Sequence, residues 1–327
     1  MTIEDLAEFA GTSHANLKQL ADNLSAPTYY GIFSYVTYNR GRREIVVPTT
    51  ELDSVTKNLH RSFIAELLYE PPSHVHGFVR GRSPLTNAAQ HLDKTCVLRV
   101  DLREFFPSID SSRVKLALLG QEFESDAVDL CTRVVTIGGR LPIGLSTSPI
   151  ISNLVFEETD HALAIYCESE GLVFTRYVDD MSFSGEVTDR NLREITTILL
   201  NNGWQVNDRK TVFMRRGGPQ YVTGLFVGCP DRPRIPRRIK RQMRRICFLI
   251  QRFGYIAYME EFGGAEAQMI PNRLYGWARY IASVEPSVGY PLLRTVRQHV
   301  PESHPHSEDH SRSLPGLRII ESLDEIQ

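Results

Sequence analysis

The sequence is poor in cysteine, and the few cysteines it has stand apart from one another. Among 327 residues there are five, at positions 96, 131, 167, 229 and 247, with no Cys-x-x-Cys spacing. An odd number of scattered cysteines makes neither a disulfide framework nor a zinc site. We therefore expect reduced thiols that mostly fill the core of a cytoplasmic protein.

Long apolar runs and an excess of one charge are also absent. No run is long enough to span a bilayer, and the first residues do not follow a secretory signal pattern, so we expect no membrane contact. The net charge of −2 hides an asymmetry, because nine basic and no acidic residues lie between Arg232 and Arg252, while acidic residues gather after Pro301. The basic segment predicts a local binding site for a polyanion.

Two adjacent carboxylates mark the most informative stretch of the chain. Residues 174–185 read Phe-Thr-Arg-Tyr-Val-Asp-Asp-Met-Ser-Phe-Ser-Gly, which predicts a β-hairpin with Asp179 and Asp180 at its turn. Adjacent like charges repel, and a bound cation removes the repulsion. Mg²⁺ is the natural candidate, because it is usually held by one or two carboxylates together with substrate phosphates. A solvated Asp-Asp turn is the alternative, and the other motifs of the chain weigh against it.

A third carboxylate follows a short apolar strand. Residues 97–102 read Val-Leu-Arg-Val-Asp-Leu, which places Asp101 near the end of that strand, and Phe105 and Phe106 come next. Residues 141–149 read Leu-Pro-Ile-Gly-Leu-Ser-Thr-Ser-Pro, a loop that opens a helix predicted over 150–170.

These three motifs, in this order, resemble the palm motifs of reverse transcriptases, and their joint order and spacing make a chance match remote. Residues 87–91 read Asn-Ala-Ala-Gln-His, which is similar to the Asn-Ala-x-x-His signature of retron reverse transcriptases. Residues 222–224 read Val-Thr-Gly, which looks like a triplet of the same enzymes. The resemblance covers roughly residues 30 to 290.

The resemblance implies an α+β right-hand polymerase with fingers, a palm built on an antiparallel sheet, and a helical thumb. We expect these parts in chain order: an N-terminal helical extension over 1–28, fingers over 29–95, palm over 96–230 with a finger insertion at about 112–140, thumb over 231–300, and a polar tail over 301–327.

For the chemistry, the resemblance implies nucleotidyl transfer assisted by two Mg²⁺ ions. Asp101 is expected to bridge the ions, Asp179 to be its partner and Asp180 to be the third catalytic carboxylate. The backbone carbonyl of Leu102 is expected to add a ligand.

Four further residues are expected to contact the incoming deoxynucleotide. Arg43, in a hairpin predicted over 29–48, would bind the triphosphate, because a guanidinium can hold phosphate oxygens in pairs. Phe106 would exclude a ribose 2′-OH, and Lys210 would lie near the leaving pyrophosphate. Ile143 stands where many members of the family have Gln. Val36 stands where many have a lysine, a contact that Arg40 or Arg42 would replace.

RNA contacts are expected from three places: an arginine-bearing turn, the two retron signatures and one face of a basic helix predicted over 236–253. The residues are Arg80, Arg82, Asn87, His91, Val222, Thr223, Gly224, Arg237, Arg241, Arg244 and Arg245.

By resemblance, the chain is expected to be the RNA-directed DNA polymerase of a retron. It would copy a structured non-coding RNA into single-stranded DNA, primed from a 2′-OH of that RNA, in bacterial antiviral defence with a separate effector protein. Two alternatives stay open: another bacterial defence reverse transcriptase, possibly one that needs no template, and a catalytically idle RNA-binding scaffold.

Overall fold

The computed structural model describes residues 1–24, 28–37, 41–262 and 270–301; of residues 35–37 and 41–43 it describes the backbone alone. The chain divides into two compact units. The first comprises Met1–Ser83 and Thr95–Met214, and the second comprises Pro84–Lys94 and the chain from Arg215 onward. No helix within the described ranges is both long and apolar enough to cross a bilayer.

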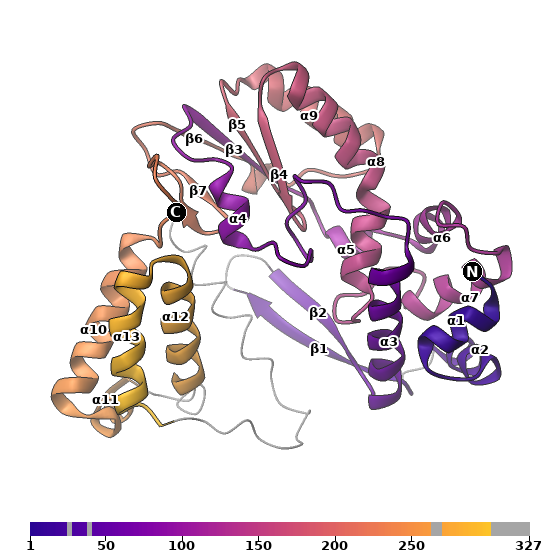
Figure 1. The fold of residues 1–327 in the computed structure, drawn as a ribbon, viewed down its shortest axis with the longest axis horizontal. Helices are drawn as coiled ribbons and strands as arrows, with labels where there is room; N and C mark the ends of the chain where they lie inside the picture. Colours follow the sequence, from indigo (N-terminus) through magenta and orange to yellow (C-terminus); the bar gives the residue numbers. More distant parts are fainter. Residues whose placement is uncertain (25–27, 38–40, 263–269, 302–327) are drawn as a thin grey trace. The chain divides into compact units, whose positions relative to one another are not determined.

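A four-stranded sheet of order β4-β5-β3-β6 organises the first unit. Its strands are β3 (Cys96–Asp101), β4 (Val173–Tyr177), β5 (Asp180–Gly185) and β6 (Val212–Arg215). Strand β5 pairs antiparallel with both β3 and β4, which confirms the predicted hairpin and the predicted strand before Asp101. Helices α8 (Ser148–Ser169) and α9 (Asp189–Asn201) lie beside this sheet (Figure 1).

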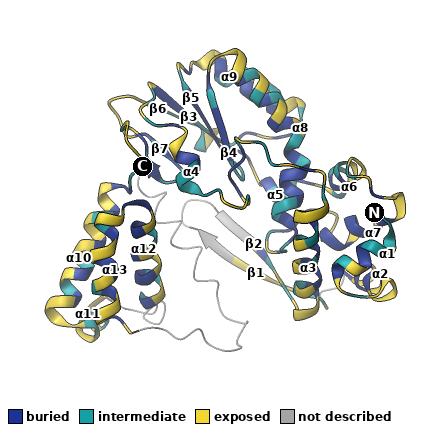
Figure 2. Cartoon of the chain, in the orientation of Figure 1, coloured by how far each residue is buried: buried dark blue, intermediate teal, exposed yellow. Residues whose placement is uncertain are grey.

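Large aromatic side chains fill the space between α8 and the segments that follow the sheet strands. The ring centroids of Phe156 and Trp204 are 4.7 Å apart, and Phe105 lies 5.3 Å from Trp204 and 5.8 Å from Phe156. All three are buried, in a core that Figure 2 shows in dark blue. Such rings contribute large apolar areas to stability. As predicted, this core also takes up cysteine thiols: Cys96, Cys131 and Cys167.

The N-terminal segment forms two helices, α1 (Ile3–Ala10) and α2 (His14–Asn23). Thr2 and Asp5 make a reciprocal capping box at the start of α1. Gly11 ends α1 in the left-handed conformation, and the Ser13 hydroxyl caps α2 by accepting the N–H of Asn16 in its first turn.

A second hairpin, β1 (Tyr30–Thr37) with β2 (Gly41–Pro48), is joined to the loop before α8 by main-chain atoms. The Val46 N–H donates to the carbonyl of Ile143 at 2.8 Å. Gly144 has φ +123°, and a Cβ there would lie 2.0 Å from the Val46 oxygen, so only glycine fits this approach. The tip of the predicted hairpin, with Arg40, lies outside the described residues.

The other helices of the first unit are α3 (Thr50–Glu66), α5 (Phe105–Ser108), α6 (Ser111–Leu119), α7 (Ser125–Val135) and the 3-10 turn η1 (Asp208–Lys210).

In the second unit, the short helix α4 (Pro84–Ala89) packs on a tight hairpin of β7 (Tyr221–Val222) and β8 (Leu225–Phe226). Helices α12 and α13 touch so closely that a Cβ on Gly289 would lie 2.1 Å from the Ala282 nitrogen. The four longer elements of the unit are helices α10 (Arg237–Phe253), α11 (Tyr255–Phe262), α12 (Ile270–Val284) and α13 (Pro286–His299).

Residues 204–206 form only an isolated bridge between Val206 and Leu102, because the chain turns into η1 two residues later. Residues 221–226 form a hairpin and not a single strand, since Thr223 and Gly224 both adopt positive φ. Residues 84–94 and 215–230, expected in fingers and palm, cluster in contacts with the second unit. The subdomain boundaries themselves stay a prediction, and residues 302–327 of the tail lie outside the described residues.

Candidate active site

The register of β3 and β5 places two of the predicted carboxylates opposite each other. Asp101 pairs with Asp180, and directly opposed residues of an antiparallel pair have Cβ atoms about 4.5–5.5 Å apart. Asp179 occupies the turn between β4 and β5, and its carbonyl accepts the Leu102 N–H at 3.3 Å. The fold therefore gathers the three predicted aspartates and the Leu102 backbone at one end of the sheet.

Asp101 is bound by two residues, one directly before η1 and one at its end. The Lys210 ammonium donates to both carboxylate oxygens of Asp101, at 2.8 and 2.9 Å. The Asn207 backbone N–H donates to the Asp101 carbonyl at 2.8 Å, and its side-chain amide lies 3.3 Å from the carboxylate. Sequence reasoning placed Lys210 in the site but did not find Asn207, whose only signal was its place three residues before that lysine.

Asp180 is in an unfavourable setting for a charged carboxylate. Its Oδ1 atom is buried and has no hydrogen-bond partner among the residues that the structure describes. Burial raises the pKa of Asp180 to about 7; Arg99 opposes that rise, and the neighbouring charges of Asp179 and Asp101 add to it. A cation beside Asp180 would satisfy the free oxygen and lower the pKa.

The site fits a divalent cation, although no ready-made cluster of three or more His, Cys, Asp or Glu ligands exists among the described residues. At Asp101, Lys210 supplies the positive charge that a metal ion would bring. The free buried oxygen of Asp180 and the all-oxygen donor set match what Mg²⁺ and similar hard cations prefer.

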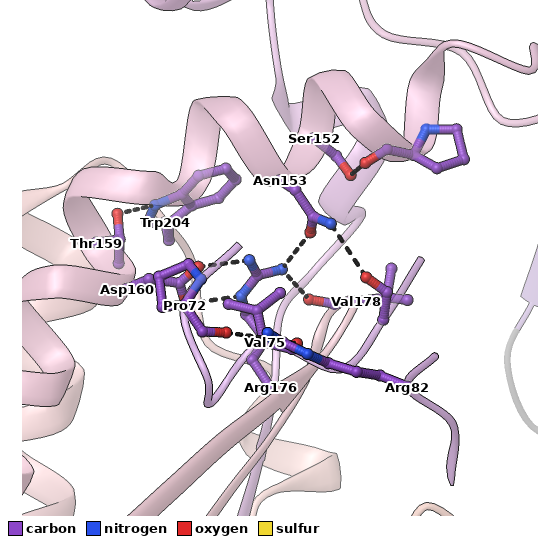
Figure 3. Close-up of polar contacts among 12 residues, drawn as sticks. Pro72, Val75, Arg82, Ser152, Asn153, Thr159, Asp160, Arg176, Val178 and Trp204 are labelled. Carbon is purple, nitrogen blue, oxygen red and sulfur yellow. Dashed lines mark hydrogen bonds and ion pairs between the residues drawn. The ribbon is translucent and has the colours of Figure 1, made fainter. Parts of the chain in front are cut away.

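Arg176, a residue that the sequence analysis did not select, supports the turn that carries Asp179. Val178 has φ +64°, a conformation that β-branched residues rarely adopt. Its carbonyl accepts a hydrogen bond from the buried guanidinium of Arg176 at 3.1 Å (Figure 3). Arg176 stands next to the Tyr-Val-Asp-Asp motif in the sequence, and its position inside a predicted strand was the only available signal.

The two phenylalanines after Asp101 take different places. Phe105 is buried in the aromatic core, whereas Phe106 is half-buried, with its ring 5.4 Å from Phe105 and 6.3 Å from Phe78. Phe105 is therefore a core residue, whereas part of the Phe106 ring is accessible. Phe78, which is 52% exposed, was not expected beside it.

Of the other two residues expected to contact the nucleotide, the structure describes one in full and one by its backbone alone. Ile143 is half-buried and meets β2 through its carbonyl. Arg43 pairs with Tyr35 in the β1–β2 ladder, but its side chain lies outside the described part of the structure.

Three of the expected RNA contacts need correction. Asn87 and His91 are fully buried at 0% exposure, so neither side chain is available to RNA. Arg82 bonds inward, with its guanidinium donating to the carbonyls of Pro71, Pro72 and Val75. Arg82 therefore ties its own loop together, while Arg80 is exposed as expected.

The two retron signatures meet in the second unit. Helix α4, which carries Asn87, packs on the β7–β8 hairpin whose turn is Thr223-Gly224, and the Thr223 hydroxyl donates to the Pro84 carbonyl at 2.9 Å. Val222, a fourth expected RNA contact, is fully buried there, so its side chain is not available to RNA either. Both signatures thus build one packed element.

The basic helix is amphipathic, as predicted. Its buried stripe consists of Ile239, Met243, Cys247 and Ile250, whereas Ile246 is only half-buried. The expected RNA-binding side chains all lie on its exposed surface: Arg237, Arg241, Arg244 and Arg245.

Comparison with known proteins identifies the class. Residues 42–252 match the family model described as "Reverse transcriptase (RNA-dependent DNA polymerase)", and this span contains all three aspartates. The chain therefore belongs to the reverse transcriptase family, and the predicted α+β polymerase fold and polymerase class are confirmed. Enzymes of this family generally use divalent metal ions and an RNA template.

Within this family the chain is similar to retron enzymes, as the sequence motifs predict. It is 29% identical to the retron Mx65 reverse transcriptase of Myxococcus xanthus, over 83% of this chain and 71% of that one. It is 32% identical to the Mx162 enzyme of the same organism, over 74% and 57%, and 26% identical to the Escherichia coli Ec86 enzyme, over 74% and 72%. The chain thus spans a little over half of the Mx162 protein.

Among solved structures, telomerase from Candida albicans in complex with a fragment of telomeric RNA aligns with 86% of this chain and 60% of its own, at 13% identity and a TM-score of 0.43. This distance is too great to bear on function.

Lys210 should compete with metal ions for Asp101. We expect Lys210→Met to gain more thermal stability from added Mg²⁺ or Mn²⁺ than the wild type gains, by about 2 °C or more. The reason is that metal binding no longer has to break the ion pair. Thermal unfolding at increasing metal concentration measures the difference.

Lys115→Met is the matched control, because Lys115 makes a surface pair at 2.6 Å with Asp129, which is not one of the three aspartates of the site. Equal metal-induced shifts in wild type, control and Lys210→Met would contradict the competition.

Proposed function

We propose that this chain is the polymerase of a retron and copies a structured non-coding RNA into single-stranded DNA, primed from a 2′-OH of that RNA. The observation that carries the proposal is the pairing of Asp101 with Asp180 beside the Asp179 turn. The similarity to retron enzymes over most of the chain supports the retron assignment. A separate effector protein and a role in antiviral defence belong to the same proposal.

The proposed metal set is two Mg²⁺ ions held by Asp101, Asp179, Asp180 and the Leu102 carbonyl. Bound there, the metals would supply charge for in-line attack of a hydroxyl on the α-phosphate of a deoxynucleotide. Lys210, once displaced from Asp101, has a free ammonium to offer the developing charge on the leaving pyrophosphate.

Two features support the choice of substrate. Phe106 presents a half-buried ring five residues beyond Asp101, held against Phe105 and Phe78, and we assign it the rejection of ribonucleotides. Helix α10 presents exposed arginines on the face opposite its buried stripe, and we assign that face to the RNA backbone. Arg80, Arg43 and Ile143 keep their proposed contacts with RNA and nucleotide.

The metal assignment is tested by Asp179→Asn. We expect DNA synthesis to fall by at least about 10²-fold, the loss typical of removing one protein group that stabilises the charge of a transition state. RNA affinity should stay unchanged. Primer extension and RNA binding are measured in parallel. The control is Asp208→Asn, an exposed carboxylate paired with Arg103, and near-normal extension by Asp179→Asn would remove it from the site.

The sugar gate is tested by Phe106→Ala. Loss of the ring opens space beside the sugar, so the preference for dNTP over rNTP should fall by about tenfold or more. Competing incorporation of the two nucleotides gives the ratio. Phe106→Tyr retains the ring and should retain the preference; an unchanged ratio in Phe106→Ala would make this residue part of the core only.

The RNA face of α10 is tested by replacing Arg241, Arg244 and Arg245 together with Gln. Phosphate contacts release counterions, so the log–log slope of affinity against salt should become shallower by roughly two to three units. Cognate and unrelated structured RNAs should weaken alike, because phosphates carry no sequence information.

The control replaces three exposed arginines of the first unit with Gln: Arg61, Arg190 and Arg193. A slope unchanged in the α10 variant, or reduced equally in both, would show that α10 presents only a solvated face.

A further inference from the structure

We propose that Arg176, held by Asp160 and Asn153, is a positioning residue that sets the main chain of the Val178–Asp179 turn and with it the placement of the catalytic carboxylates. This inference rests on the proposed function. It assigns a task to a buried ion pair that makes no contact with a substrate.

Arg176 is fully buried, and three acceptor groups surround its guanidinium. Its Nε donates to Asp160 Oδ1 at 2.8 Å and its Nη2 donates to Asp160 Oδ2, a two-pronged pair with both side chains at 0% exposure. The remaining nitrogen, Nη1, donates to Asn153 Oδ1 and to the Val178 carbonyl, each at 3.1 Å. Figure 3 shows these bonds converging from helix α8 and from the turn.

The same network also reaches the turn on the side of the Val178 nitrogen. The Asn153 amide donates to the Gly77 carbonyl at 3.0 Å. Gly77 lies so close to the turn that a Cβ on it would be 2.5 Å from the Val178 nitrogen. Residues 74–76 are joined to β4 through main-chain bonds of 2.8 Å to Arg176. Val178 thus has a fixed carbonyl on one side and a fixed glycine against its nitrogen on the other.

This grip matters because Val178 is in a costly conformation. A valine at φ +64° is held only where its surroundings over-determine it, at an energy of order 1–3 kcal/mol. Relaxation of Val178 would rotate the next peptide, whose residue is Asp179, and Asp180 begins β5 directly after it. The hydrogen bond from Arg176 to the Val178 carbonyl therefore acts on Asp179 and Asp180 through the covalent chain that joins them to Val178.

Stability alone does not account for the pair. Apolar residues of similar volume can often replace a buried ion pair with no loss of stability, whereas removal of one partner is strongly destabilising. The bond to the Val178 carbonyl is what an apolar replacement cannot reproduce. The two effects can therefore be separated by removing both charges together.

The decisive variant is Arg176→Met combined with Asp160→Leu. We expect it to fold and to bind RNA as the wild type does. We expect its kcat to fall by roughly 10- to 100-fold, because small misplacements of catalytic groups cost on this scale. The Mg²⁺ concentration for half-maximal activity should rise several-fold, and metal-induced thermal stabilisation should weaken, with little change in KM for RNA.

The matched control is Thr159→Val, on the same helix one residue before Asp160. It removes a buried hydrogen bond of 2.9 Å from the Trp204 indole but touches nothing in the turn. Its kcat and metal dependence should match those of the wild type, whatever its stability. A kcat loss in Thr159→Val as large as in the double variant would reduce Arg176 to a general structural role.

A second variant decides the matter if the double variant does not fold. Gly77→Ala leaves the ion pair intact and pushes on the Val178 nitrogen, so the same loss of kcat and metal affinity is expected. Gly120→Ala, where a Cβ meets only ordinary contact at 3.4 Å, is its control. Wild-type kcat and metal dependence in a folded variant of either design overturn the inference. Failure of the wild type itself to extend a primer would instead overturn the proposed function.

Discussion

Repulsion between carboxylates is the constraint on which this structure depends. The antiparallel register of β3 and β5 forces Asp101 and Asp180 to face each other, and the turn adds Asp179 beside them. The protein answers with cations of its own: Lys210 on Asp101, and Arg99, which faces the same side of β3 as Asp101 and opposes the rise in the pKa of Asp180. The balance is incomplete, since one Asp180 oxygen is buried and finds no partner in the described parts of the chain. This excess of negative charge favours binding of a divalent cation. The backbone geometry of the turn and of the paired strands keeps the three carboxylates close together.

Local patterns in the sequence were enough to predict the parts with a strong periodic signal. The hairpin around Asp179, the strand before Asp101 and the basic helix came from alternation and helical spacing, and the structure confirms them. The three aspartates could be grouped only because their motifs resemble a known family, since nothing local reveals that residues 101 and 180 pair.

Long-range burial was the information that the sequence did not contain. Asn87 and His91 were expected to contact RNA because they belong to a retron signature, but both side chains are completely buried. Arg82 looked like a presented cation, whereas three nearby carbonyls occupy its donors. Arg176 is adjacent to the aspartate motif in the sequence, but only the fold shows that Asp160, on the preceding helix, neutralises its charge. Arg82 and Arg176 thus both donate to carbonyls of the protein's own main chain.

The contact between Gly144 and Val46 bears on how this family can vary. Because the β1–β2 hairpin meets the loop before α8 through main-chain atoms, the joint depends on the absence of a side chain at 144 and not on the identity of its neighbour. The side chain of residue 143 is therefore not needed to hold the loop in place. A change of side chain at 143 leaves the main-chain bond from Val46 to its carbonyl intact and therefore carries little structural cost. The glycine beside it has no such freedom.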